Sequence, residues 1–350
     1  FQKAGAYINV YKGSDSYRLN LVDGSQVKDA NGDVMAASRT LSSTEGALFI
    51  NKTSNGTGGD GDDVIINTLA NATIDGGKGK DKIFNFATSV TSITGGEGEN
   101  YIYTVGLTAG TITTGTDTAG SNLKIVGNMS GGTINLGKGD NEVDATGYSL
   151  SNVTVNSDAA STNTITAKDV SGTNAWKLLG TENTLTVSTL DLTGTTGLEF
   201  GTGENNLTAS LAKGTITDKG KGTHTIKTMD GATLNAEDST AGTSVSITGS
   251  AKGATFKMGT GANEINAVGK VLDSVTITDK AVGASTNVMA GSLIGTSSVT
   301  LKGNTTVGSS VNVSGTIKGA TIDTGAGIGT VTAGYVADSN IKMDMGGADA

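Results

Sequence analysis

The residues best suited to chemistry are four aspartates in two glycine-rich segments near the N-terminus. Residues 58–65 read GGDGDDVI, and residues 76–83 read GGKGKDKI. Ca²⁺ takes six to eight oxygen ligands in proteins, several of them carboxylates. The two segments therefore predict one or two calcium sites in the N-terminal part of the chain, built from Gly58, Asp60, Asp62, Asp63, Gly76 and Asp81.

Both segments match the nonapeptide GGxGxDxU, in which U is a large apolar residue. On this motif the chain resembles the repeats-in-toxin family and the wider class of secreted bacterial surface proteins that carry such repeats. The resemblance implies a parallel β-roll whose glycine-rich turns hold Ca²⁺ through aspartate carboxylates and backbone carbonyls. It is partial, because the family repeats the motif every nine residues, whereas here 76 − 58 = 18 and residues 67–75 lack the motif.

The motif fades along the chain. A third copy at residues 95–102 reads GGEGENYI, with Asn100 in place of the key aspartate, and Glu97 and Glu99 are the carboxylates that remain there. A purely structural interpretation stays open beside calcium binding. Glycine tolerates positive φ and aspartate bonds its own backbone, so both residue types also serve simply to make a turn.

A column of polar residues continues from these aspartates at the same place in each repeat. Stacked asparagines can bond from one repeat to the next and satisfy turn backbone that would otherwise lack partners. We therefore expect an asparagine ladder to succeed the aspartate turns and interpret His224 as one of its members rather than as a catalyst. The column is Asp63, Asp81, Asn100, Ser121, Asn141, Asn163, Asn183, Asn205, His224, Thr243, Asn263, Thr286 and Ser309.

Composition argues against catalysis and against two classes of partner. The chain has one His, no Cys, and arginine only at Arg18 and Arg39, outside the repeats. Around the single His there is no Ser and Asp at a spacing that suggests a catalytic triad, so we predict no catalytic residues and no enzymatic activity. A net charge of −9 without a basic patch disfavours nucleic acid. No apolar run approaches the roughly 20 residues that cross a bilayer, so we expect no membrane insertion.

The element that positions these turns is a repeat of about 20 residues, here called a rung. The main apolar column makes thirteen steps over 341 − 74 = 267 residues, which is about 20.5 residues a step, as in solenoid proteins. Thr usually precedes each member, and such alternation predicts a half-buried β-strand. The column is Ile74, Ile93, Ile112, Ile134, Val155, Leu178, Phe200, Ile216, Leu234, Phe256, Ile277, Leu301, Ile322 and Ile341.

Two further apolar columns accompany the main one. The second strand of each rung carries Ile65, Ile83, Ile102, Leu123, Val143, Ile165, Leu185, Leu207, Ile226, Val245, Ile265, Val288, Val311 and Val331. A third inward column carries Leu69, Leu107, Met129, Leu150, Leu211, Met229, Leu272, Ile317 and Val336, with gaps at Thr88, Thr173, Thr195 and Thr296. We predict an all-β fold, a parallel β-solenoid of about 14 rungs over residues 57–350. Since one rung buries too little apolar surface to offset its chain entropy, stability must come from stacking.

Residues 1–56 do not follow the repeat. Alternation at residues 7–11 and 17–21 predicts short antiparallel strands, and Asp23-Gly24 and Asn31-Gly32 are turn signals, so we expect an N-terminal β cap or docking segment. The chain starts at Phe1 without Met and stops at Ala350 in what looks like another rung, which suggests a processed chain or a piece of a longer one. An open edge of parallel strands near Ile341 would invite pairing.

These expectations favour an extracellular structural protein of a bacterial or archaeal cell surface. The rod would serve as a filament subunit, surface-layer component or adhesin stalk, with other copies of the chain as head-to-tail partners. One alternative is an ice-binding solenoid, because outward threonines recur at 111 and 113, 215 and 217, and 276 and 278. The other alternative is a β-helix enzyme acting on polysaccharide.

Overall fold

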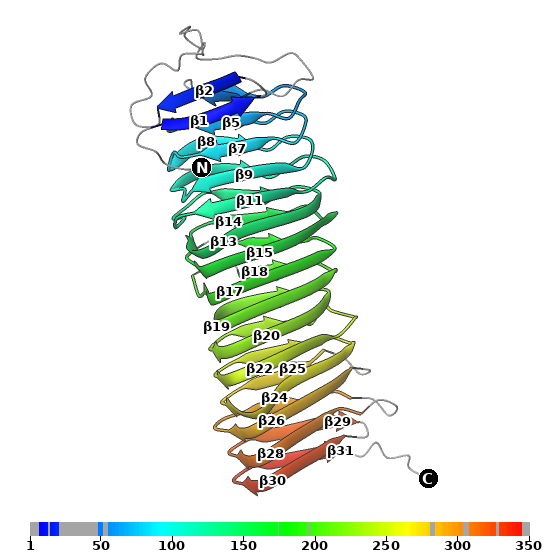
Figure 1. The fold of residues 1–350 in the computed structure, drawn as a ribbon. Helices are drawn as coiled ribbons and strands as arrows, with labels where there is room; N and C mark the ends of the chain where they lie inside the picture. The colour runs from blue at the N-terminus through cyan, green and yellow to red at the C-terminus, as the bar shows by residue number, and fades with distance from the viewer. Residues whose placement is uncertain are drawn as a thin grey trace.

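The structure, a computed structural model, is a rod of about 13 rungs of parallel β-strands wound around one apolar core (Figure 1). It describes residues 7–12, 15–20, 48–51, 55–173, 175–194, 197–280, 284–303, 308–326 and 329–344. Rungs follow one another along the rod in chain order, from the N-terminal part at one end to the C-terminal part at the other. The predicted all-β parallel solenoid is confirmed.

One ladder of strands runs the length of the rod on the side of the second apolar column. It consists of β3 (Leu48–Asn51), β5 (Val64–Asn67), β7 (Lys82–Asn85), β9 (Asn100–Val105), β11 (Ser121–Val126), β13 (Gly139–Ser151), β15 (Ser161–Ser171), β17 (Glu182–Leu192), β19 (Glu204–Asp218), β20 (Lys221–Asp230), β22 (Thr243–Lys252), β24 (Ala262–Asp273), β26 (Ser285–Ile294), β28 (Ser310–Lys318) and β30 (Thr330–Ala337).

A second ladder carries the main apolar column. It consists of β4 (Asn55–Thr57), β6 (Thr73–Asp75), β8 (Ser89–Thr94), β10 (Ala109–Thr113), β12 (Thr133–Leu136), β14 (Thr154–Ser157), β16 (Trp176–Leu178), β18 (Leu198–Phe200), the C-terminal part of β19, β21 (Thr233–Asn235), β23 (Thr255–Met258), β25 (Thr276–Asp279), β27 (Ser298–Thr300), β29 (Thr321–Ala326) and β31 (Asn340–Asp344). The parallel ladders already include β3 and β4, which pair with β5 and β6.

Longer strands of the first ladder carry two inward segments each. In β13 the register with β15 is interrupted between Ala145 and Ser149, and pairing resumes at Ser149, which places Leu150 opposite Val170. The third apolar column therefore lies on the same strands as the second column. Along each strand it follows the second column, on the far side of the bulge. Such an interruption bends the chain while the rest of the ladder stays paired.

The main column is present, with three members shifted by two residues. Val155 pairs with Trp176, Trp176 with Leu198, and Leu198 with Ile216. Val299, not Leu301, lies between Ile277 and Ile322. The prediction for Leu178, Phe200 and Leu301 was therefore wrong in register by two residues. Their inward orientation was predicted correctly, because side chains two residues apart on a strand point to the same side.

The third column has no gaps at the positions predicted for them in its middle section. Leu150, Val170 and Leu190 follow one another, then Ala212 pairs with Met229, and Leu293 lies between Leu272 and Ile317. Thr173 and Thr296 were therefore the wrong positions, and Ala212 takes the place predicted for its neighbour Leu211. The gap predicted at Thr195 lies outside the described residues. The columns together form one continuous core of buried, mostly aliphatic side chains.

The predicted N-terminal strands form an antiparallel hairpin, β1 (Tyr7–Lys12) with β2 (Asp15–Asn20), separate from the large ladders. The turn signals at residues 23–24 and 31–32 lie outside the described residues. No helix in the described part of the chain is long and apolar enough to cross a bilayer.

Candidate functional site

The predicted calcium residues fall into an inner and an outer set. Asp63 and Asp81 are buried in the polar column, directly beneath the glycine-rich turns. Asp60 and Asp62 are exposed on those turns. The structure therefore stacks the two segments as predicted but divides the four carboxylates between the interior and the surface.

One oxygen of each inner carboxylate accepts a hydrogen bond from a backbone amide. Oδ2 of Asp63 accepts a bond from the N–H of Gly59 at 2.7 Å, and Oδ1 of Asp81 accepts one from the N–H of Asp63 at 2.7 Å. On the surface, Oδ1 of Asp62 accepts from the N–H of Lys80, also at 2.7 Å. The first of these bonds closes the turn of its own rung, and the other two join that rung to the next.

Oδ2 of Asp81 is different, because it is buried and has no hydrogen-bond partner among the described residues. Burial, followed by the repulsion of Asp63, raises the pKa of the Asp81 carboxyl to about 7. An orphaned carboxylate oxygen is the kind of group that a cation would satisfy. Yet no group of three or more His, Cys, Asp or Glu in the described residues is arranged to hold a metal ion. Calcium binding therefore stays a prediction that rests on Asp81.

The glycines of both segments are required by stacking itself. A Cβ added to Gly58 would lie 1.9 Å from the carbonyl oxygen of Gly76, and one added to Gly76 would lie 2.1 Å from that of Gly95. No other residue fits at such an approach of backbone to backbone. The repeated glycine of the motif is thus explained by rung spacing, whether or not a metal ion is bound.

The predicted asparagine ladder is confirmed in the middle of the rod. Nδ2 of each buried asparagine donates to Oδ1 of the next, from Asn141 to Asn163 at 3.4 Å, Asn163 to Asn183 at 2.8 Å and Asn183 to Asn205 at 2.9 Å. Nδ2 of Asn205 also donates to the carbonyl oxygens of Gly201 and Gly203 in its own turn. One amide therefore satisfies both the neighbouring rung and the turn backbone.

His224 does not belong to this polar column, contrary to the prediction. It pairs with Leu207 and Val245 in the second apolar column, while Gly222 pairs with Asn205 and Thr243. Ile226 is likewise displaced by two residues. The polar position is filled instead by Asp218, whose Oδ1 accepts from Nδ2 of Asn205 at 2.7 Å and whose Oδ2 lies 2.9 Å from Nε2 of His224. Both side chains of this pair are fully buried.

A second polar ladder was not predicted. Nδ2 of Asn51 donates to Asn67, Nδ2 of Asn67 donates to Asn85 at 2.7 Å, and Nδ2 of Asn85 donates to Oγ1 of Thr104 at 2.9 Å. Each of Asn67, Asn85 and Thr104 stands two residues after a member of the second apolar column. Aligning that position as well would have found this ladder from the sequence.

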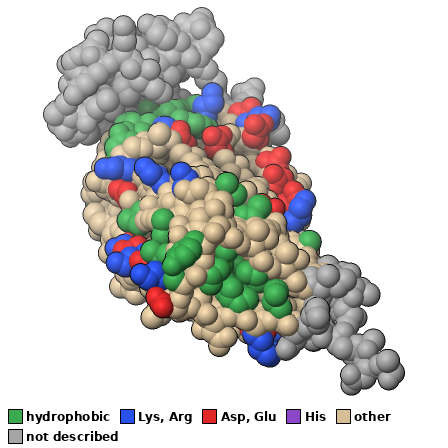
Figure 2. Space-filling model, turned by 90° about the horizontal axis from the view of Figure 1, so that it is seen from below, with side chains coloured by type: hydrophobic (Ala, Val, Ile, Leu, Met, Phe, Trp, Pro, Cys, Tyr) green, Lys and Arg blue, Asp and Glu red, His purple; other side chains and the backbone are tan. Residues whose placement is uncertain are grey.

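The C-terminal end of the described rod exposes the apolar columns. Ile317 is 0% exposed, whereas Val336, its partner in the last rung, is 44% exposed. Tyr335 and Met343 are also exposed there, and Val331 and Ile341 are only partly buried. Figure 2, which views the molecule from this end, shows hydrophobic side chains clustered on a surface that is otherwise mostly polar.

Within the described residues, the strands of this last rung are paired on one side only. β30 pairs with β28, and β31 pairs with β29. The end of the rod therefore combines exposed apolar side chains with an open edge of parallel strands. We call it the C-terminal end face, made of Val331, Tyr335, Val336, Ile341 and Met343.

Comparisons of the chain with family models, with curated proteins and with solved structures found no match. The likeness to repeats-in-toxin proteins therefore rests on residues 58–65 and 76–83 alone.

Proposed function

We propose that this chain is an extracellular structural protein, a rigid rod whose copies join head to tail. The observation that carries the proposal is the C-terminal end face. Every inner rung is covered on both sides, but the last described rung presents its apolar columns and its strand edge on one side. Such an edge is a template for further strands.

A second copy is the occupant that suits this surface best. Its own rungs carry the same three apolar columns at the same spacing, so stacking would continue the ladder and bury Val336 as Ile317 is buried. A contact between unlike ends is heterologous and does not close, so it produces filaments. Surface-layer component and adhesin stalk are variants of the same role, which differ in what the rod is attached to.

Location and metal belong to the same proposal. Residues 58–65 and 76–83 resemble calcium-binding repeats of secreted bacterial surface proteins, which supports an extracellular site on a bacterial or archaeal cell. The rod needs no active site for this role, and we assign no catalytic residue. We propose neither nucleic acid nor the interior of a membrane as a partner of the rod.

Sedimentation of the purified chain across a range of concentrations tests the proposal. We expect the average mass to rise steadily with concentration and with Ca²⁺, without stopping at a dimer. A monomer that persists at high concentration in Ca²⁺ would exclude the role of filament subunit and leave that of adhesin stalk.

A second candidate function is ice binding, favoured by one specific array. On the outer face of the first ladder, two columns keep register over five rungs: Thr164 and Thr166, Thr184 and Thr186, Asn206 and Thr208, Thr223 and Thr225, and Ser244 and Ser246. Parallel strands hold such side chains about 4.8 Å apart along the rod. A regular array of hydroxyl and amide groups of this kind would order water at its surface.

Thermal hysteresis at micromolar protein tests this second function. Thr208→Tyr would break the centre of the array, and Thr68→Tyr, at an exposed position outside both threonine arrays, is the matched control. Hysteresis that Thr208→Tyr abolishes and Thr68→Tyr preserves would support ice binding. Its absence from the unchanged protein would exclude that function.

A further inference from the structure

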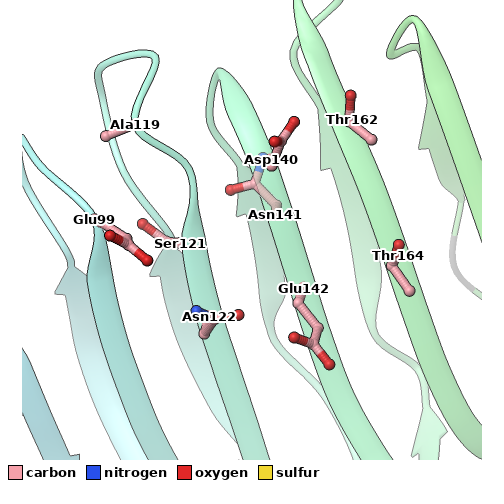
Figure 3. A pocket seen from close by; sticks show the side chains of 9 residues that line it. All are labelled: Glu99, Ala119, Ser121, Asn122, Asp140, Asn141, Glu142, Thr162 and Thr164. Carbon is pink, nitrogen blue, oxygen red and sulfur yellow. The ribbon is translucent and has the colours of Figure 1, made fainter.

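A cleft of about 460 Å³ opens on the outer surface across the strands β9, β11, β13 and β15, and it begins at Glu99 of the third glycine-rich segment. Figure 3 shows its lining residues on the neighbouring strands β9, β11, β13 and β15 and the turns before them. Three carboxylates, those of Glu99, Asp140 and Glu142, line it with the amide of Asn122. The volume lies within the range of small-molecule sites.

The cleft exists because one turn is longer than its neighbours. From Ile112 to Leu123 the chain takes 123 − 112 = 11 residues, whereas from Ile93 to Ile102 it takes 102 − 93 = 9. The extra residues form a wall that contains Ala119. Asp117 fixes this wall, since its carboxylate accepts bonds from the N–H of Gly98 at 2.7 Å and from that of Ala119 at 3.2 Å.

One residue that lines the cleft, Ser121, carries its hydroxyl group in the interior of the rod. Ser121 stands in the polar column, 1% exposed, and its Oγ has no hydrogen-bond partner among the described residues. The ladder passes it by, because Oγ1 of Thr114 donates directly to Oδ1 of Asn141 at 2.8 Å. A buried hydroxyl without a partner is costly. This oxygen has almost no accessible surface, so it takes no part in binding, and the outward side chains of the cleft make the contacts.

Aromatic rings border the cleft on the N-terminal side. Tyr101 pairs with Asn122 on the next strand, so its outward side chain stands beside the cleft. Ring centroids lie 6.2 Å apart for Phe84 and Tyr101, 6.1 Å for Phe84 and Tyr103, and 5.9 Å for Phe86 and Tyr103. All four side chains are partly exposed. They form a continuous surface, which we call the aromatic platform.

We propose that the cleft and the aromatic platform together bind an oligosaccharide of neutral or amino-bearing sugars. A sugar ring presents apolar C–H groups on its faces, which suit an aromatic ring, and hydroxyls at its rim, which suit carboxylates and amides. Carboxylates are the stronger hydrogen-bond acceptors. Three of them in one cleft disfavour acidic sugars by repulsion, although Lys80 pairs with Glu99 at 2.9 Å.

The register gives the direction of the bound chain. Tyr101, Asn122, Glu142 and Thr164 are consecutive partners across four strands, in one outward column. Strands are about 4.8 Å apart, so these four side chains span about 14 Å along the rod. The oligosaccharide therefore lies parallel to the rod axis, with one sugar on Tyr101 and its neighbours over Asn122 and Glu142.

Calorimetric titration of the full chain in a chelator, with hexasaccharides of glucose, mannose, glucosamine and galacturonic acid, tests the proposal. We expect at least one neutral or basic hexasaccharide to bind and the galacturonate to bind at least tenfold more weakly. Tyr101→Ala should weaken binding at least fivefold, and Tyr101→Trp should restore it. Glu142→Gln should weaken binding several-fold.

Matched controls separate binding from folding. Tyr335→Ala removes an exposed tyrosine elsewhere, and Glu264→Gln changes a glutamate in the same outward column further along the rod. Neither should alter binding. Ser121→Ala should leave binding unchanged without lowering the melting temperature, because its Oγ is closed off from the cleft and makes no bond within the fold. No binding by any hexasaccharide, equal binding of galacturonate, or equal losses in the controls would overturn the proposal.

Discussion

Nε2 of His224 lies 2.9 Å from Oδ2 of Asp218, and neither side chain is exposed. The pair interrupts two columns at once, since His224 replaces an aliphatic residue between Leu207 and Val245 and Asp218 replaces an asparagine next to Asn205. The ring of Phe200 stacks on His224 with centroids 5.9 Å apart. One polar pair thus joins the apolar and the polar columns in the middle of the rod.

His224→Leu should destabilise the rod although leucine suits its column. The change leaves Oδ2 of Asp218 buried without its partner, and breaking a buried pair in this way costs about 3–5 kcal/mol. The double variant His224→Leu/Asp218→Asn should recover much of that loss, because an asparagine at 218 keeps the acceptor for Asn205. Urea unfolding followed by circular dichroism measures both. A single variant as stable as the unchanged protein would show that the pair contributes nothing.

Asn183→Ala should cost about 1–3 kcal/mol, since it leaves buried polar groups without partners. Nδ2 of Asn183 donates to Oδ1 of Asn205 and to the carbonyl oxygen of Gly180, and its own Oδ1 accepts from Asn163. Asn206→Ala, one strand further along and facing outward, is the matched control and should change stability by less than about 0.5 kcal/mol. Hydrogen exchange should show faster opening around residues 163–205 in the first variant alone.

Much of this fold could be predicted because each rung repeats the same physical pattern. Alternation along the strands reports which side chains face inward, and the period reports stacking. Alternation does not distinguish two registers that differ by two residues. Leu198 and Phe200 are both apolar and lie on the same face, so the sequence did not show which of them belongs to the main column. His224 was misplaced for the same reason.

The cleft and the platform could not be predicted from columns at all. The cleft depends on the longer turn before Ser121, a departure from the repeat rather than a part of it. The platform brings together Phe84 and Phe86, on and just after β7, with Tyr101 and Tyr103 on β9, about one rung later in the sequence. Exposed aromatics gain meaning only when their neighbours on the adjacent rungs are known.

In a chelator, stability should fall as pH rises from about 4 to about 7. The unfolded Asp81 carboxyl loses its proton near pH 4, but burial raises its pKa to about 7 in the fold, so the folded state holds more protons across that window. The loss is on the order of 1–4 kcal/mol. Asp81→Asn should remove this part of the slope, whereas the exposed control Asp60→Asn should retain it. Thermal melts between pH 4 and pH 8 measure this dependence of stability on pH. The same dependence in Asp81→Asn as in the unchanged protein would contradict its assignment to Asp81.

Ca²⁺ at pH 8 should stabilise the N-terminal rungs selectively. Binding at one hundred times the dissociation constant adds about 2.7 kcal/mol. Hydrogen exchange should therefore slow in residues 58–102 and stay the same in later rungs. Asp81→Asn should remove the effect, because the asparagine lacks the orphaned carboxylate oxygen. Uniform protection along the whole rod, or no calcium uptake by the unchanged chain, would count against the site.

Electron microscopy of the purified chain, with Val336→Lys beside it, tests head-to-tail assembly most directly. Val336 lies in an inward column on the C-terminal end face, and a lysine there would place a charge where the next copy should stack. Val268→Lys is the matched control, because Val268 is 60% exposed but far from that end in the chain. We predict filaments one rod wide for the unchanged chain and for Val268→Lys, and isolated rods for Val336→Lys. Filaments that persist in Val336→Lys, or isolated rods of the unchanged chain at high concentration in Ca²⁺, would contradict the account.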